Sequence, residues 1–177
     1  MTESTKSGHA RAKTWREKEE AREEIPAVIY GKGAGLGMFR DEQKAAQALA
    51  LTRKAAKAGY APAHLDLGVM DFKGRILPKD IGSALTHLKQ SALQGENIDG
   101  NHIAFAFLAE IYNDQKGGHF NPQQAYYFML MANQLMPSYD TYDWVDRHGL
   151  TPRQKAGIKK RAAQWKAGTP FWEAAVK

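Results

Sequence analysis

The side chains that could carry chemistry in this chain are six histidines and a few grouped carboxylates. The histidines show no H-E-x-x-H or comparable metal-binding spacing, and none accompanies a G-x-S-x-G serine. Glu110 and Asp114 lie four residues apart and could act as an acid and a base, although such pairs on a repeat surface are more often solvated. The absence of cysteine excludes thiol catalysis and disulfides. We therefore expect no catalytic residue and a protein that is not an enzyme.

Two further segments match ligand-binding motifs only in part. Residues 31–37, GKGAGLG, follow an apolar stretch but fit neither phosphate-binding spacing, G-x-x-x-x-G-K-[ST] or G-x-G-x-x-G. Asp140, Asp143 and Asp146 lie three apart, whereas a calcium loop places ligands at positions 1, 3 and 5 with glycine at position 6. We expect an inter-helix loop at the first segment, a short helix at the second, no metal site and no cofactor.

The elements that position these residues are organised around the stretch 61–95, which is predicted to form two antiparallel helices. Gly74 can end the first helix, because a residue without Cβ adopts a positive φ easily. Asp80 is placed to cap the second helix through its carboxylate, and Gly95 is expected to close it. Small residues, Gly68 and Ala84 among them, let the two helices approach closely. The apolar faces are formed by Leu65, Leu67, Gly68, Met70 and Phe72 on the first helix and by Ala84, Leu88, Ser91 and Ala92 on the second.

This hairpin recurs along the sequence. A forward shift of 41 residues aligns Gly59, Ala63, Leu67, Gly68, Asp80, Ala84 and Leu88 with Gly100, Ala104, Leu108, Ala109, Asn121, Ala125 and Met129. A backward shift of 36 residues aligns Ala84, Ser91, Ala92 and Gly95 with Ala48, Ala55, Ala56 and Gly59. A hairpin that cannot bury its apolar stripe alone stacks on such neighbours, so three in a row predict a short superhelical array.

The repeated residues resemble the Sel-one-like repeat, a relative of the tetratricopeptide repeat with two antiparallel helices per unit. Asp71 stands at the tyrosine position of the second unit, His87 at its aromatic position, and Asn121 at the aspartate position of the third. The matching residues are Tyr30, Gly33, Gly35, Leu36, Asp41, Lys44, Ala45, Lys54, Ala55, Ala56 and Gly59 in the first unit; Gly68, Gly74, Leu77, Asp80, Ala84, Ala92 and Gly95 in the second; and Tyr112, Ala125, Phe128 and Ala132 in the third. The resemblance implies a surface that binds other proteins.

The resulting prediction is an all-α fold, a short right-handed superhelical array of antiparallel helix pairs with flanking helices at both ends. This alpha-alpha solenoid has about three repeats. Residues 1–25 are expected to form a polar segment with a solvated helix that docks through Trp15, residues 26–137 the repeat array, and residues 138–177 the capping helices. The last helix should begin with the capping box of Thr151, Pro152 and Gln154, and Phe171 and Trp172 should fold back on it.

Charge is spread unevenly over a chain of 177 residues with net charge +6. Residues 61–149 are mildly acidic and residues 150–177 are strongly basic, which bears on partners rather than on fold. No apolar run approaches the ~20 residues that span a bilayer. We expect a cytoplasmic protein if the chain is complete, and a periplasmic one if a signal or lipid anchor has been removed.

Three functions are compatible with these features. The first is a protein-binding module that uses the concave face of the array, and the family's habits suggest an immunity protein that neutralises a secreted toxin effector. The second is a nucleic-acid or anionic-surface binder that uses the basic C-terminal helix, although nucleic acid is the less expected partner. The third is an enzyme of unknown type. For the first function, the first helix of each repeat predicts five partner-binding residues: His64, Asp66, Asp71, His102 and Glu110.

Overall fold

The computed structural model describes residues 42–74, 76–94, 101–137 and 149–173, with side chains from residue 45 onward. Within these ranges every regular element is an α-helix, and no strand occurs. The chain divides into two units, Met1–Tyr60 and Ala61–Lys177. The predictions for residues 10–24, residues 31–37, the aspartates of 138–148 and Gly95 fall outside the described residues. The division into residues 1–25, 26–137 and 138–177 stays a prediction.

In the first unit, helix α3 covers Glu42–Lys57, and a glycine follows two residues later. Gly59 adopts a φ of 84°, which a residue without Cβ reaches without strain. The N–H of Gly59 donates to the carbonyl of Ala56 (2.8 Å), and the N–H of Tyr60 donates to that of Ala55 (3.1 Å). This pair of bonds is a Schellman motif, which satisfies carbonyls that the helix leaves without partners.

The second unit begins with the predicted hairpin of α4 (Ala61–Lys73) and α5 (Ile81–Ala92). Gly74 follows α4 with a φ of 66°. Asp80 caps α5, because its carboxylate accepts a hydrogen bond from the N–H of Ser83 at 3.0 Å. The buried residues of α5 are the four that the apolar pattern selected: Ala84, Leu88, Ser91 and Ala92.

The next hairpin, α6 (Asn101–Asn113) and α7 (Pro122–Leu135), repeats the same local bonds 41 residues later. The N–H of Asp80 donates to the carbonyl of Asp71 (3.0 Å), and the N–H of Asn121 donates to that of Tyr112 (2.8 Å). Asn121 also caps α7 through its side chain, which accepts from the N–H of Gln124 at 3.1 Å. The repeat seen in the sequence is therefore a repeat of backbone geometry.

Helix α9 (Pro152–Gln164) packs against α7 and begins with the predicted capping box. After it, the segment 165–173 runs back along the helices, and the N–H of Gly168 donates to the carbonyl of Leu93 at 2.6 Å. Its aromatic side chains join the core: the Phe171 ring meets those of Phe105 (6.0 Å) and Phe128 (5.3 Å) edge-on. The predicted return of the C-terminal aromatic residues is confirmed.

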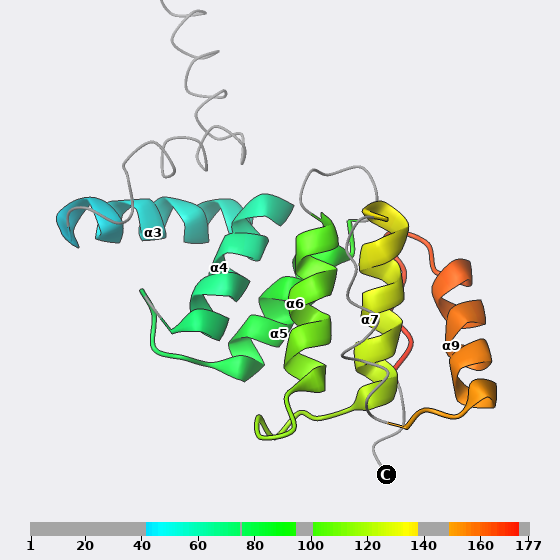
Figure 1. Cartoon of the computed structure of the whole chain (residues 1–177). Helices are drawn as coiled ribbons and strands as arrows, with labels where there is room; N and C mark the ends of the chain where they lie inside the picture. Colours follow the sequence, from blue (N-terminus) through cyan, green and yellow to red (C-terminus); the bar gives the residue numbers. More distant parts are fainter. Residues whose placement is uncertain (1–41, 75, 95–100, 138–148, 174–177) are drawn as a thin grey trace, which may run out of the picture. The chain divides into compact units, whose positions relative to one another are not determined.

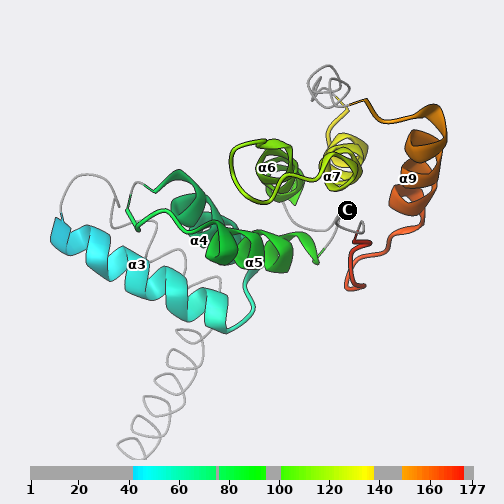
Figure 2. The same cartoon turned by 90° about the horizontal axis from the view of Figure 1, so that it is seen from below.

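Within the second unit, α4 packs on α5, α5 on α6, α6 on α7 and α7 on α9. Figure 1 shows α6, α7 and α9 side by side, and Figure 2 shows α6 and α7 nearly end-on, with α9 beyond α7. Helix α7 lies at the centre of the core, since all its residues from 124 to 133 are buried. The predicted class, an all-α solenoid of antiparallel helix pairs, is confirmed.

Candidate functional site

Two phenylalanines meet where α4 and α6 lie beside each other. The ring centroids of Phe72 and Phe107 are 5.7 Å apart in an edge-to-face arrangement, and both side chains are only partly buried. The ammonium group of Lys73 lies 4.6 Å from the centroid of Phe72 and 5.1 Å from that of Phe107. This arrangement is a cation–π contact shared by two rings. We call the surface formed by Phe72, Lys73, Phe107 and Glu110 the phenylalanine face.

The ion pair on the phenylalanine face is solvent-exposed and contributes little to stability. Lys73 Nζ is 3.6 Å from Glu110 Oε1, and the two side chains are 41% and 52% exposed. An ion pair this exposed contributes about 0–1 kcal/mol to stability. Lys79 also approaches the ring of Phe72, at 5.5 Å from its centroid. A partner could therefore rearrange these cations at little cost to the fold.

Of the predicted residues, Glu110 belongs to this surface, and Asp66 and His102 lie on the same two helices. Glu110 is exposed on α6 and belongs to the phenylalanine face. Asp66 is half-buried on α4, two helical turns before Lys73, and His102 is half-buried on α6, two turns before Glu110. These three residues are thus carried by the same two helices as the phenylalanine pair.

Asp71 was predicted to be a partner-binding residue, but its side chain is buried. It is only 6% exposed, and its carboxylate accepts a hydrogen bond from the hydroxyl of Ser83 on α5. Asp71 therefore joins the two helices of the hairpin and does not belong to an outer surface. The cause is its register: it occupies the position of Tyr112 in the next repeat, and Tyr112 packs against Phe128 with ring centroids 5.8 Å apart.

His64 also faces the seam between α4 and α5. Its Nδ1 atom is 2.9 Å from Nδ1 of His87, and the two half-buried rings are tilted by 40°. One ring must donate and the other accept, as the tautomers allow. His64 and Asp71 therefore contact α5, and they are not grouped with the other three predicted residues, Asp66, His102 and Glu110.

A pocket of about 360 Å³ lies at another place in the second unit. The ammonium group of Lys89 donates to Glu173 Oε1 at 2.9 Å, and the amide of Gln124 donates to the carbonyl of Trp172 at 2.8 Å. Burial opposes the charged form of Lys89, but the hydrogen bond to Glu173 and the nearby Tyr112 outweigh it, so the pKa of Lys89 is raised. The pocket lining comprises Lys89, Tyr112, Gly118, His119, Phe120, Asn121, Gln124 and Glu173.

The two carboxylates that could act together as an acid and a base have different contacts. Glu110 contacts Lys73, whereas Asp114 accepts a hydrogen bond from the N–H of Lys116 at 2.9 Å, so these two carboxylates have separate partners. Among the same residues, no group of three or more His, Cys, Asp or Glu side chains could hold a metal ion.

Phe72 belongs to the apolar face that the sequence predicted for the first helix of the stretch 61–95. In the structure, Phe72 and Phe107 are partly buried and pack against the core from its edge. The repeat register does not distinguish such residues: a shift of 41 residues aligns Phe107 with the polar Asp66, but it also aligns the buried Phe105 with the polar His64.

No protein-family model matches the chain, and no curated protein matches it by sequence. The structure is similar to the crystal structure of a protective antigen present in uropathogenic Escherichia coli strains, which displays an SLR fold, with a TM-score of 0.68 and 21% sequence identity. The match covers 90% of this chain and 36% of that protein, so the chain spans about a third of its neighbour's length. The likeness shows that the fold is a Sel-one-like repeat array.

Proposed function

We propose that the chain is a non-catalytic module that binds another protein through the surface of α4 and α6. The observation that carries the proposal is the phenylalanine face, a partly buried aromatic pair at a helix junction with exposed charges at its edge. Protein interfaces have this composition: an aromatic centre that becomes fully buried on binding, surrounded by a polar rim. Asp66 and His102 extend the rim along the same two helices.

The charges of the surface indicate the chemistry of the partner. Asp66 and Glu110 attract basic groups, whereas Lys73 and Lys79 lie over the rings and attract acidic ones. A contact surface of mixed charge, with an apolar or aromatic side chain at its centre, complements this arrangement. Charges at the rim act mainly on the association rate and its dependence on salt, while the aromatic pair provides most of the affinity.

Within this function, we propose that the partner is a secreted toxin effector that binding neutralises. The support is the resemblance to the Sel-one-like repeat together with the small size of the array. Such a role requires that co-production of the chain protects bacterial cells from a cognate effector. It also predicts that a gene for that effector lies beside the gene for this chain.

The decisive experiment begins with a pull-down from the native host, after which affinity for the captured protein is measured by surface plasmon resonance. Phe72→Ser with Phe107→Ser should weaken binding by about 2 kcal/mol or more, a typical hot-spot loss. Asp66→Lys with Glu110→Lys should slow association in a salt-dependent way. The matched control reverses three charges on α9, at Lys155, Lys159 and Lys160, and should leave binding unchanged. If only the control variant loses affinity, the proposal fails.

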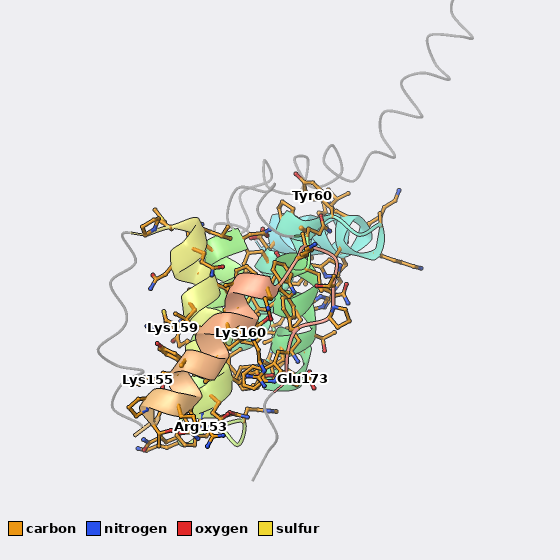
Figure 3. All side chains as sticks on the ribbon, turned by 90° about the vertical axis from the view of Figure 1, so that its right-hand side faces the viewer. Tyr60, Arg153, Lys155, Lys159, Lys160 and Glu173 are labelled. Atoms are coloured by element: carbon orange, nitrogen blue, oxygen red, sulfur yellow. The ribbon has the colours of Figure 1, made fainter. Side chains whose placement is uncertain are left out.

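One observation favours the second candidate, an anionic partner. Helix α9 contains no acidic residue, and Arg153, Lys159 and Lys160 are exposed on it. Figure 3 shows these side chains on the helix that faces the viewer. A nucleic acid bound there would show an affinity that falls steeply with salt. A charged outer face is also what the cap of a repeat array needs for solubility, so the phenylalanine face carries the stronger argument.

A further inference from the structure

The two hairpins differ in what fills the same place between their helices. His64 and His87 occupy the positions that Phe105 and Phe128 hold 41 residues later. The two phenylalanine rings are 6.3 Å apart and nearly parallel, at 24°, and the two imidazoles are 5.2 Å apart at 40°. Two phenyl rings are therefore enough to pack the space between the two helices of such a hairpin. The imidazoles add what phenyl rings lack, two ring nitrogen atoms that lie 2.9 Å apart.

We propose that His64 and His87 form a binding site for a divalent transition-metal ion, Cu²⁺ or Ni²⁺, which the two Nδ1 atoms coordinate together. These atoms are 2.9 Å apart and come from different helices. Imidazole nitrogen is a preferred ligand of such ions. Both side chains are half-buried and so partly exposed to solvent, from which water molecules can complete the coordination.

The distance between the two nitrogens indicates the coordination geometry and so the metals that fit it. With metal–nitrogen distances of about 2.0–2.1 Å, nitrogens at this spacing subtend an angle of about 90° at the ion. A tetrahedral Zn²⁺ site would need its nitrogens about 3.3 Å apart, whereas the tetragonal geometry of Cu²⁺ and Ni²⁺ places neighbouring ligands at a right angle. Cu²⁺ should bind more tightly than Ni²⁺, because affinities for the same ligands follow that order.

Metal binding at this site requires one proton to move within the histidine pair. In the metal-free pair, one Nδ1 carries the proton of the shared hydrogen bond and the other accepts it. Coordination requires a lone pair on both Nδ1 atoms, so the donating ring moves its proton to Nε2 through solvent. Two neutral imidazoles then bind the ion, no proton is released overall, and no electron is transferred. The ion links α4 to α5 and so stabilises the folded hairpin by mass action.

The test uses the full chain in a non-chelating buffer near neutral pH, titrated with Cu²⁺ and with Ni²⁺ by isothermal titration calorimetry. The test variant combines His64→Phe with His87→Phe, which copies the pair that the next hairpin already contains. The matched control combines His102→Gln with His119→Gln, two histidines at other places in the same unit. We expect the test variant to lose the tightest-binding equivalent of metal and the control to keep it.

Two further measurements complete the design. Electron paramagnetic resonance of the Cu²⁺ form should show coupling to two imidazole nitrogens, and this signal should disappear in the test variant. If the double phenylalanine variant does not fold, as judged by circular dichroism, His87→Gln alone should weaken Cu²⁺ binding, because it removes one of the two imidazole ligands. Unchanged Cu²⁺ affinity in a folded variant, or loss of the tight site in the control, would overturn the proposal.

Discussion

Gly68 on α4 lies directly against Leu88 on α5. A Cβ atom at Gly68 would be 2.7 Å from Leu88 Cγ and 3.1 Å from the backbone nitrogen of Leu88. Leu88 is completely buried, so its side chain has no space into which it could move. The close approach of the two helices, which the small residues in the sequence predicted, therefore depends on the absence of a single methyl group.

From this contact we predict that Gly68→Ala lowers the free energy of unfolding by about 1–3 kcal/mol, the usual cost of overpacking. Gly68→Leu and Ala84→Leu should cost at least as much. The measurement is urea denaturation followed by far-ultraviolet circular dichroism. Gly82→Ala is the matched control, because a Cβ there meets only Asp80 Oδ1, at 3.4 Å. The control should be neutral or stabilised by up to about 1 kcal/mol, since alanine favours helix over glycine; equal losses in both variants would contradict the packing argument.

A second prediction concerns the bond between Ser83 and Asp71. Ser83→Ala removes a hydrogen bond from a buried carboxylate and should cost about 1–3 kcal/mol. The double variant Asp71→Ala with Ser83→Ala should be more stable than the sum of the two single losses implies, because no carboxylate is then left without its partner. A double-mutant cycle measures this coupling. Strict additivity would show that the two side chains do not depend on each other.

Alkaline pH should destabilise the fold through Tyr127 and Lys89. Burial raises the pKa of Tyr127, although a backbone hydrogen bond at Trp172 partly opposes it. The pKa of Lys89 is also raised, because its hydrogen bond to Glu173 and the proximity of Tyr112 outweigh the effect of burial. In both cases the folded state holds the proton more tightly, so the stabilisation is fully present below the ordinary pKa of about 10 and is lost as pH rises through the folded pKa.

The corresponding measurement is the free energy of unfolding between neutral pH and strongly alkaline pH. It should stay constant until about pH 10 and then fall, by at most about 1.4 kcal/mol per pH unit for each group. Tyr127→Phe and Lys89→Met should each make the fall less steep. A slope that is the same in both variants as in the parent protein would assign the alkaline transition to other groups.

The sequence by itself determined the helices, their ends and the repeat. Asp80 and Thr151 were predicted as caps, and Asn121 was aligned with Asp80. Each of the three accepts a hydrogen bond from the backbone N–H three residues later. Gly74 was predicted to end a helix, and it has a positive φ. These features were predictable because capping depends on atoms within one helical turn, so the local sequence contains all the partners.

Only the tertiary structure decided which residues form the candidate binding surface. Asp71 and His64 are polar residues on a first helix, as Asp66 is, yet they point into the seam with α5. Phe72 and Phe107 are apolar residues of the kind that fills cores, yet they meet at the edge of the core, where both stay partly exposed. The physical reason is that the exposure of a helical residue depends on which element covers its side of the helix. That element can lie 40 residues away in the chain, as α6 does from α4. Residue type and local spacing do not contain that information.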